Sequence, residues 1–517
     1  MTDTDVIIVG AGPVGLLLAA ELRSAGVRTL ILERRPQIWE IPKANGFGGQ
    51  ILHLLRYRGL MERFRAVGAE PHPAPAIPFG GLHVDFSTLR DNPMPAMGIP
   101  QPKLERVLDA YATELGAEIR RGHEVVAVSQ DRETVTVEVR GPDGPYRLTA
   151  RYLAGCDGGN SRIRELAAIP FPGTLYPEVL RLGQVAIPEG VTRLDNGDLE
   201  VPGAGRIPAG YTYTDNGLFA FGSHPGAMMI QTTENEPADA DDDRPLTLTE
   251  LQDSIHRVLG VRMPLGEPLR LSRYRARAGL AERYRAGRIL LAGDSAHQFP
   301  ATGVGLNAGL TDAVNLAWKL AAAVHGWAPD GLLDTYHDER HLAGAHILRH
   351  TRAQTVLRRV QDPDAQALRE LFEQLFSDEQ PVRRIADMIA GNDIRYPAPG
   401  SDRHALIGAF VPDLALRTDR GATSVAELMR PAHPVLLDLA DRADLREIAR
   451  AWDSRIEIHT ATTDHPPADA VLIRPDAYVA WAAPTGEPAD TAAPALRDAL
   501  AHWFGAPVKE FAPVNDR

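Results

Sequence analysis

Residues 6–33 read VIIVGAGPVGLLLAAELRSAGVRTLILE, and this stretch decides the fold of the first part of the chain. A short apolar run, 6–9, leads directly into a Gly-x-Gly-x-x-Gly turn. A helical pattern and a second apolar run follow. Strand, glycine turn, helix and strand in this order are typical of a dinucleotide-binding unit. The sequence therefore predicts an α/β protein with a Rossmann-type nucleotide-binding domain.

The three glycines of this unit have separate physical tasks. Gly10 permits the tight turn, Gly12 lets the backbone approach a pyrophosphate, and Gly15 lets the helix pack closely on the strand. Glu33 ends the second strand, where a carboxylate can accept hydrogen bonds from a ribose diol. The same carboxylate disfavours a 2′-phosphate. We therefore expect FAD or NAD, rather than NADP, as the tightly held nucleotide.

Composition places the chain among ordinary globular proteins. Its 517 residues allow about three domains, and 44% of them are hydrophobic. The net charge of −13 argues against a nucleic-acid partner, which would favour a basic face. Cys156 is the only cysteine, which excludes an intrachain disulfide, a redox pair and a cysteine metal cluster. No signal peptide or membrane span is recognisable, so we expect a cytoplasmic protein.

Changes in periodicity divide the chain into three parts. Strand-like segments interrupt the α/β pattern and predict a mixed β-sheet substrate domain interleaved with the nucleotide-binding domain. The expected nucleotide-binding segments are 1–75, 98–175 and 272–395, and the expected substrate segments are 76–97 and 176–271. Residues 400–517 follow a proline- and glycine-containing linker and show a βαββα pattern that resembles a thioredoxin-like fold, without redox cysteines.

A second glycine turn follows another apolar run. Residues 155–162 read GCDGGNSR and include Asp157 and Gly158. Taken alone, this pattern is typical of a simple turn.

The third glycine turn carries a carboxylate. The apolar run 289–292 delivers Gly293 and Asp294 to the carboxyl end of a buried strand, where ligands bind in open α/β sheets. The carboxylate of Asp294 can accept hydrogen bonds from a polyol. A loop of small residues, 300–307, then runs into a helix whose N–H groups and dipole can stabilise a negative charge.

These three motifs, in this order, resemble those of the p-hydroxybenzoate hydroxylase-like, single-component FAD-dependent aromatic hydroxylases. The likeness is greatest to the subgroup of aromatic polyketide hydroxylases and rifampicin monooxygenase, and it covers nearly the whole chain. That subgroup also has a cysteine-free, thioredoxin-like C-terminal domain. The resemblance implies an FAD site formed by Gly10, Gly12, Pro13, Gly15, Glu33, Arg34, Lys43, Gln101, Asp157, Gly158, Gly293, Asp294, Pro300, Gly303, Gly305, Leu306 and Asn307.

Some of these positions carry specific implications. Arg34 matches a basic residue beside the adenine, and Gln101 matches a residue beside the ribityl chain. Lys43 stands where the family often has an arginine that holds the flavin or NADPH, and lysine lacks the planar fork. Val304 stands where the flavin-facing loop usually has a polar residue. We expect these two departures to alter NADPH affinity and the seating of the flavin ring.

The resemblance implies a monooxygenase that uses NADPH or NADH and O2. A C4a-hydroperoxyflavin would hydroxylate an electron-rich carbon of a small polycyclic aromatic polyketide or related natural product. The pocket must exclude water and be mostly apolar. The substrate contacts we predict from the strand-like segments are Phe79, Phe86, Tyr211, Tyr213, Phe221 and Met229.

Several alternatives stay open at this point. No side chain stands out as a general base among His53, His83, His224 and His297, so the catalytic residues are unassigned. The same fold and cofactor serve Baeyer–Villiger insertion into a polyketide ketone. An oxygen-independent flavoprotein that binds an aromatic metabolite is a third reading. The oligomeric state is open as well.

Overall fold

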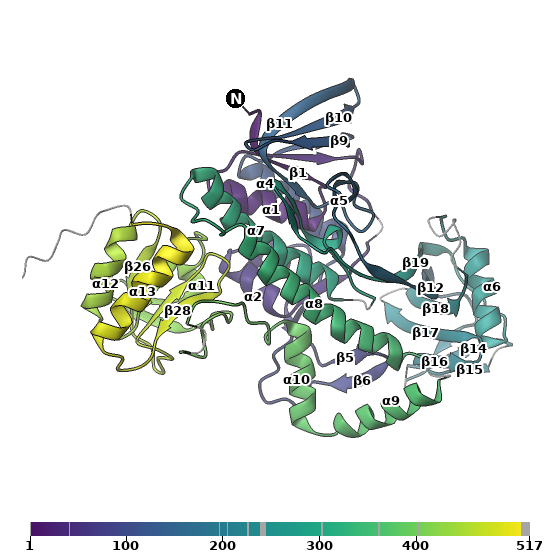
Figure 1. Ribbon diagram of the computed structural model, residues 1–517. Coiled ribbons are helices and arrows are strands. Elements are labelled where there is room, and N and C mark those ends of the chain that lie inside the picture. The colour runs from purple at the N-terminus through teal and green to yellow at the C-terminus, as the bar shows by residue number, and fades with distance from the viewer. Residues whose placement is uncertain are drawn as a thin grey trace, which may run out of the picture.

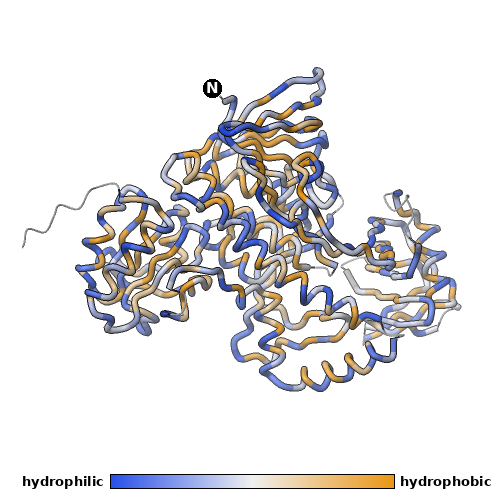
Figure 2. The backbone as a smooth tube through the Cα atoms, viewed as in Figure 1, coloured by the Kyte–Doolittle hydropathy of each residue, from blue (hydrophilic) through white to orange (hydrophobic). Residues whose placement is uncertain are grey.

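The computed structural model describes most of the chain. The described residues are 2–40, 42–195, 197–203, 205–224, 227–237, 244–300, 303–359, 362–400 and 403–507, without the side chains of 223 and 224. Figure 1 shows a central body, a β-sheet region to its right and a C-terminal region to its left. Apolar residues gather inside each of these bodies, and polar residues follow their outer loops (Figure 2).

A sheet with parallel strands at its centre forms the main body. Its parallel strands lie in the order β21-β11-β1-β2-β8. The antiparallel strands β9 and β10 extend it from β11, and β20 pairs with β21. The bounds are β1 Thr4–Val9, β2 Thr29–Glu33, β8 Glu118–Arg121, β9 Glu124–Gln130, β10 Val135–Gly141, β11 Gly144–Gly155, β20 Arg285–Ala286 and β21 Ile289–Leu291.

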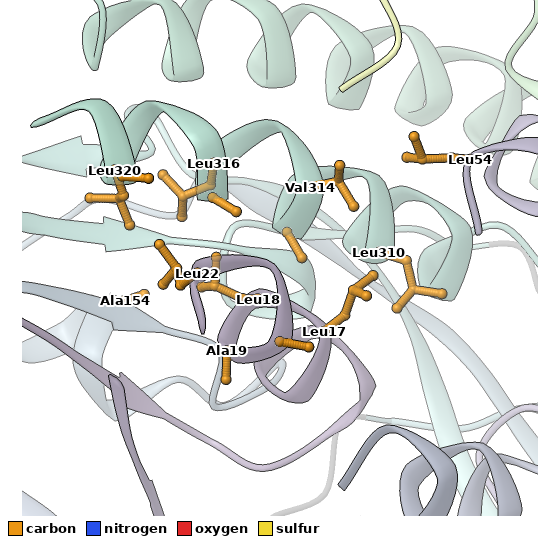
Figure 3. Packing of buried hydrophobic residues seen from close by; sticks show 14 of the residues in the cluster. Leu17, Leu18, Ala19, Leu22, Leu54, Ala154, Leu310, Val314, Leu316 and Leu320 are labelled. Carbon is orange, nitrogen blue, oxygen red and sulfur yellow. The ribbon is translucent and has the colours of Figure 1, made fainter. Parts of the chain in front are cut away.

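Two helices, α1 and α7, pack together over this sheet. Helix α1 spans Pro13–Ser24, and α7 spans Gly305–His325. Figure 3 shows aliphatic side chains of α1 directed at those of α7. The labelled side chains at this contact come from Leu17, Leu18 and Leu22 of α1 and from Leu310, Leu316 and Leu320 of α7. Each such buried side chain contributes about 1.5–3 kcal/mol, so this contact fixes α7 firmly on the sheet.

A second, antiparallel sheet forms the region to the right in Figure 1. Its strands lie in the order β16-β17-β18-β12-β19-β22, and helix α6 (Leu248–Leu259) covers one of its faces. The long strands β12 and β19 connect this region with the main body. The bounds are β12 Gly173–Ala186, β16 Gly210–Thr214, β17 Gly217–His224, β18 Ala227–Asn235, β19 Pro268–Leu280 and β22 His297–Gln298.

Further helices and short strands lie around these two sheets. Helix α8 crosses the molecule, and α9, α10 and the β5–β6 hairpin lie below it in Figure 1. The helices are α2 Gln50–Tyr57, α3 Met61–Arg65, α4 Gln101–Glu114, α5 Arg162–Leu166, α8 Asp334–Leu357, α9 Pro363–Leu375 and α10 Glu379–Ala390. The short strands are β3 Gly46–Gly48, β4 His72–Pro73, β5 Ala76–Phe79, β6 Leu82–Asp85, β7 Pro95–Gly98, β13 Thr192–Arg193, β14 Leu199–Val201 and β15 Gly205–Ile207.

The C-terminal region has its own mixed sheet, in the order β26-β25-β27-β28. Strands β25 and β26 are parallel, and β27 is antiparallel to both β25 and β28. Its elements are β23 Ala415–Thr418, β24 Gly421–Ser424, α11 Val425–Leu428, β25 Val435–Asp438, α12 Ala443–Ala449, η2 Arg450–Trp452, β26 Glu457–Thr460, β27 Ala470–Ile473, β28 Val479–Ala483 and α13 Ala489–Phe504.

The elements predicted from periodicity are largely present, with three differences. The structure contains strand β26, which the βαββα pattern expected after residue 400 does not include. This strand is short and of mixed polarity. Helix α6 was not predicted within the strand-like segment 176–271. Helix α7 begins at Gly305, inside the predicted loop 300–307. Among the described residues, no helix combines the length and apolar character of a membrane span.

Buried charges tie the C-terminal region to the main body. Arg474 donates to both carboxylate oxygens of Glu339 in α8, at 2.5 and 2.8 Å. Lys319 of α7 donates to the same carboxylate at 2.7 Å. Asn315 donates to Glu339 at 2.7 Å and to Asp476 at 2.8 Å. All five side chains are buried, so removing one charge would leave its partners uncompensated.

Replacing the central anion should therefore destabilise the whole molecule. Burial opposes the charge of Glu339, but Arg474 and Lys319 more than offset this and lower its pKa to about 2. We expect Glu339→Gln to lower the free energy of unfolding by about 3–5 kcal/mol at pH 7 in urea titrations. Ionisation of Glu339 stabilises the fold above the ordinary carboxyl pKa, and this stabilisation is lost as the pH falls towards 2. The difference between wild type and variant should shrink over that range.

An exposed ion pair provides the control. Glu114 and Arg63 pair at 2.7 Å on the surface, and Glu114→Gln should leave the urea midpoint close to that of the wild type. A Glu339→Gln protein as stable as this control would contradict the role assigned to the buried charges.

Candidate active site

The first glycine turn brings two strand ends into close contact. Gly10 has φ +107°, and a Cβ on it would lie 2.4 Å from the carbonyl oxygen of Cys156, at the end of β11. A Cβ on Gly15 would lie 2.1 Å from the carbonyl oxygen of Gly10. Gly12 is different, because a Cβ there would meet no atom within 4 Å. Gly10 and Gly15 are thus required by packing, and Gly12 borders open space at the N-terminus of α1.

Glu33 holds this turn in place. One of its carboxylate oxygens accepts a hydrogen bond from the N–H of Ala11, and the other from the N–H of Arg35, both at 2.8 Å. Each oxygen keeps a further lone pair, so the carboxylate can still accept a ribose hydroxyl. The sequence indicates only that Glu33 can bind a ribose hydroxyl. The contact with Ala11 adds a structural role that spacing alone does not reveal.

The second turn is organised by a buried carboxylate. Asp157 accepts hydrogen bonds from the Ser161 hydroxyl at 2.5 Å and from the N–H of Ile163 at 3.1 Å, next to the start of α5. Burial raises the pKa of Asp157. Gly158 has φ +85° and open space where a side chain would stand. Asp157 therefore shapes the turn, and Gly158 leaves room beside it.

The third turn depends on a residue that the sequence analysis missed. The N–H of Gly293 donates to Asp312 of α7 at 2.9 Å. The same carboxylate pairs with His297 at 2.7 Å and with Arg340 at 2.6 Å. Although burial opposes the charge of Asp312, Arg340 and His297 lower its pKa overall. This buried anion fixes the short helix η1 (Gly293–Ser295), which carries Asp294.

The sequence does contain a signal for Asp312. Asp312, Asn315 and Lys319 are polar residues spaced by three and four positions within the otherwise apolar helix α7. That spacing puts them on one face of the helix, and all three are buried with polar partners. A second missed residue is Arg164, which donates to the carbonyl oxygens of Ser295 (2.9 Å) and Gly159 (3.1 Å) and so links the second and third turns.

Asp294 and Gly303 are exposed to solvent. The carboxylate of Asp294 belongs to an exposed residue, and one of its oxygens lies 3.7 Å from the position of a Cβ on Gly305. Gly303 has φ +94° with open space beside it. Asn307 accepts a hydrogen bond from the N–H of Gly48 at 3.3 Å, so β3 lies against the start of α7.

The remaining predicted cofactor residues lie at different places around these turns. Arg34 is exposed and lines an open groove with Gly122, Glu124 and Arg140. Gln101 begins α4, half-buried, and its amide donates to Glu105 at 2.7 Å. Other members of the set differ in burial: Lys43 is exposed, Pro13 and Pro300 are buried, and Leu306 is half-buried against the main core.

The antiparallel sheet separates the predicted substrate contacts into two groups. Tyr211, Tyr213 and Met229 lie on the face opposite α6, as the pairing of β16, β17 and β18 requires. Gly222, the partner of Met229, has open space where a side chain would stand. Phe221 points to the other face and is buried against α6. We call the face with space at Gly222 the open face, and Phe221 is not part of it.

Phe79 and Phe86 are also removed from this open face. Both are buried in a separate apolar cluster with α9 and α10, where Phe79 contacts the rings of Phe372 and Phe376. Their prediction as substrate contacts rested on aromatic character, which core residues share. We do not include Phe79, Phe86 or Phe221 in the candidate site.

The four histidines considered as bases have different environments. His297 is buried and paired with Asp312, which makes it part of the third turn. His83 is exposed on β6, and burial lowers the pKa of the half-buried His53. The side chain of His224 lies outside the described residues. None of the three described histidines lies on the open face of the antiparallel sheet.

Together these features fit a dinucleotide with a polyol chain. Gly12, Gly158 and Gly303 each border open space, whereas Gly10 and Gly15 are closed by packing. The N-terminus of α1 supplies N–H groups for a pyrophosphate, and Asp294 supplies acceptors for hydroxyl groups. The turns lie at the carboxyl ends of β1, β11 and β21, which neighbour one another in the parallel sheet.

Comparisons with known proteins agree with this site. Residues 3–351 match the family model described as FAD binding domain, and residues 404–507 match the model described as aromatic-ring hydroxylase, C-terminal. A Streptomyces rimosus protein named 12-dehydrotetracycline 5-monooxygenase/anhydrotetracycline 6-monooxygenase is 40% identical, with 97% of this chain and 99% of the relative covered. A dialkyldecalin synthase from Streptomyces rugosporus is 36% identical over 98% and 99% of the two chains.

A solved structure shows the same fold. The anhydrotetracycline hydroxylase from Streptomyces rimosus superposes with a TM-score of 0.87 and is 38% identical, with 98% of this chain and 99% of that chain covered. The resemblance noted from the three sequence motifs is thereby confirmed. This chain belongs to the FAD-dependent aromatic-ring hydroxylases.

Proposed function

We propose that this protein is a monooxygenase that uses FAD, NAD(P)H and O2 to hydroxylate a polycyclic aromatic polyketide or a related natural product. The observation that carries this proposal is the arrangement of the three glycine turns at neighbouring strand ends, with open space at Gly12, Gly158 and Gly303. The named activities of the relatives support the substrate class. We place the enzyme in the cytoplasm, where NAD(P)H is supplied.

Residues of this chain would hold the cofactor at both ends. Glu33 would bind the ribose, the N–H groups at the start of α1 the pyrophosphate, and Asp294 the ribityl chain. Bound FAD supplies redox chemistry that passes electrons from NAD(P)H to O2 and one oxygen atom to the substrate. Helix α7 begins within the loop at 303–307, and its N-terminus would offer the positive end of its dipole to the flavin ring. Lys43 keeps a positive charge near this site but offers no planar fork.

The open face of the antiparallel sheet would receive the substrate. Tyr211, which is 43% exposed, and Tyr213 stack at 6.5 Å and provide a flat apolar surface. Arg270 lies on the same face, in one row with Gln184 and Met229, and its Nε is buried without a partner in the described part of the chain. A mostly apolar surface with a few polar groups is what binds a ring system that carries oxygen atoms.

We also propose how the chain divides into domains. The segments 1–75, 98–175 and 272–395 form the FAD-binding domain, and 76–97 and 176–271 form the substrate domain. The remaining domain is proposed to be thioredoxin-like, supported by the sheet order β26-β25-β27-β28 with a parallel β25–β26 pair. The only cysteine of the chain, Cys156, lies outside it, so this domain has no thiol chemistry. Its buried ion pair with α8 and the hydrogen bond that Asn315 of α7 donates to Asp476 support a packing role.

A second candidate function is suggested by the synthase among the relatives. In this case, the protein would bind FAD and a polycyclic metabolite without inserting oxygen. Ring insertion of the Baeyer–Villiger type is a third chemistry for the same cofactor. Product analysis separates all three.

The first experiment follows NADPH and NADH oxidation in air, with and without anhydrotetracycline and other phenolic polycyclic compounds. We expect at least one compound to stimulate reductant consumption and to gain one oxygen atom, as read by mass spectrometry. The position of that atom, determined by NMR, distinguishes a new hydroxyl group from a ring insertion. Conversion without an added oxygen, independent of O2 and reductant, would contradict the proposal and favour the synthase-like function.

A second experiment tests the assignment of Asp294. We expect Asp294→Ala to purify with little FAD, because the variant loses acceptors for the ribityl hydroxyls. Asp294→Asn keeps one acceptor and should hold an intermediate amount. The flavin content is read from the ratio of the absorbances at 450 and 280 nm, and Asp419→Ala, an exposed carboxylate in the C-terminal region, is the control. An Asp294→Ala protein with full flavin content would show that the assignment is wrong.

A further inference from the structure

A small cavity lies between the start of α7 and helices α8 and α10. Its lining includes Val304, Asn307 and Thr311 from the α7 end, His350 from α8, and Tyr478 from the C-terminal region. Its volume is about 40 Å³, which is enough to hold at least one water-sized group. The cavity can therefore accept a group that projects from a ligand. The loop at 303–307, which is proposed to face the flavin, forms one of its walls.

His350 lines this cavity and has a buried nitrogen without a partner. The side chain is only 5% exposed, and its Nε2 has no hydrogen-bond partner in the described part of the chain. Most buried side-chain nitrogen atoms are hydrogen-bonded, so an unused one in a residue that lines a cavity indicates a missing partner.

The other polar side chains in the wall are already engaged. Arg340 binds Asp312 and Tyr396, and Asn307 accepts from Gly48. The Thr311 hydroxyl donates to a backbone carbonyl of α7, and the Tyr478 hydroxyl donates to Gln50, whose own amide donates to the carbonyl of Gly391. His350 thus differs from its polar neighbours in having a free nitrogen.

A hydrogen-bond relay determines which nitrogen of His350 carries the proton. The N–H of Gly80 donates to the amide oxygen Oε1 of Gln354 at 3.4 Å. This contact leaves the amide nitrogen Nε2 of Gln354 directed towards Nδ1 of His350, at 3.3 Å. A donor aimed at Nδ1 makes that atom an acceptor, so the neutral ring carries its proton on Nε2. Burial and the nearby His346 lower the pKa of His350 to about 4, so the ring is neutral at pH 7.

The start of this relay is rigid. The Gly80 turn of the β5–β6 hairpin packs tightly on α8, because a Cβ on Gly80 would lie 2.6 Å from Cβ of Leu357. Arg369 of α9 donates to the carbonyl oxygens of Gly80 at 3.1 Å and Leu357 at 2.8 Å. The hairpin therefore orients Gln354, and through it His350.

We propose that His350 is a binding residue that donates a hydrogen bond from Nε2 to a carbonyl or phenol oxygen of a ligand in the proposed active site. The acceptor is an oxygen of the polycyclic substrate or a carbonyl oxygen of the flavin ring, because both are oxygen acceptors of the same kind. Gln354 is a positioning residue that fixes the tautomer. The inference rests on the proposed function for the identity of the ligand, but the tautomer and the free donor are properties of the chain itself.

The variants His350→Leu, His350→Gln and Gln354→Leu test this proposal. Leucine removes the donor, glutamine restores an N–H at a similar distance from the helix, and Gln354→Leu breaks the relay. Four quantities are measured for each folded variant, with the melting temperature as a check. They are the FAD dissociation constant and visible spectrum, the dissociation constant of anhydrotetracycline for the FAD-loaded enzyme, and the ¹⁵N shifts of labelled histidine at pH 7.

We expect the ¹⁵N spectrum of the wild type to contain the signals of a neutral, Nε2-protonated histidine ring. These signals should be missing in both His350 variants and altered in Gln354→Leu. If the substrate is the acceptor, His350→Leu weakens anhydrotetracycline binding about tenfold or more, His350→Gln restores most of it, and the FAD constant stays unchanged. If the flavin is the acceptor, the FAD constant or spectrum changes in the same pattern.

Other results overturn the proposal. It fails if His350 is protonated on Nδ1, if neither ligand responds to His350→Leu, or if His350→Gln is as impaired as His350→Leu. A wild type that binds FAD but no polycyclic compound refutes the proposed substrate class instead. The FAD measurements then decide the role of His350. An FAD dissociation constant and visible spectrum that His350→Leu leaves unchanged would overturn the proposal.

Discussion

The buried carboxylate of Asp312 is the interaction on which the site depends. It accepts a hydrogen bond from the N–H of Gly293 and pairs with His297 and Arg340, all without solvent. A charge buried in this way is tolerated only with full compensation, so its partners are fixed in position. One of them is the backbone of the turn that presents Asp294. The geometry of the proposed ribityl site is therefore set from inside the protein.

The same helices connect this turn with distant parts of the chain. Arg340 of α8 joins Asp312 to Tyr396, and the neighbouring Glu339 pairs with Arg474 of the C-terminal region. The C-terminal region thus contacts α8 at Glu339, directly beside the Arg340 that holds the turn. Its Tyr478 also reaches the cavity beside the loop at 303–307. These contacts give the C-terminal region a structural role next to the main body.

The sequence predicts the elements whose signals are local. The glycine turns, the apolar strands before them and the helix after Gly15 follow from short-range sterics and periodicity, and the structure contains them. Residues that act over long distances were missed, because their partners lie far away in the sequence. His350 is 270 positions from Gly80, where its relay begins through Gln354. Aromatic character likewise could not separate Tyr213 on the open face from Phe221 in the core.

The most direct test of this account is the FAD affinity of Asp312→Asn. Asparagine has nearly the same shape but no charge, and its amide nitrogen cannot accept from Gly293, His297 or Arg340. With apoprotein that still melts cooperatively, we predict that FAD binds at least about tenfold more weakly than to the wild type, as measured by fluorescence titration. An Asp312→Asn protein that binds FAD with wild-type affinity and an unchanged flavin spectrum would contradict the claim that this buried charge sets the site.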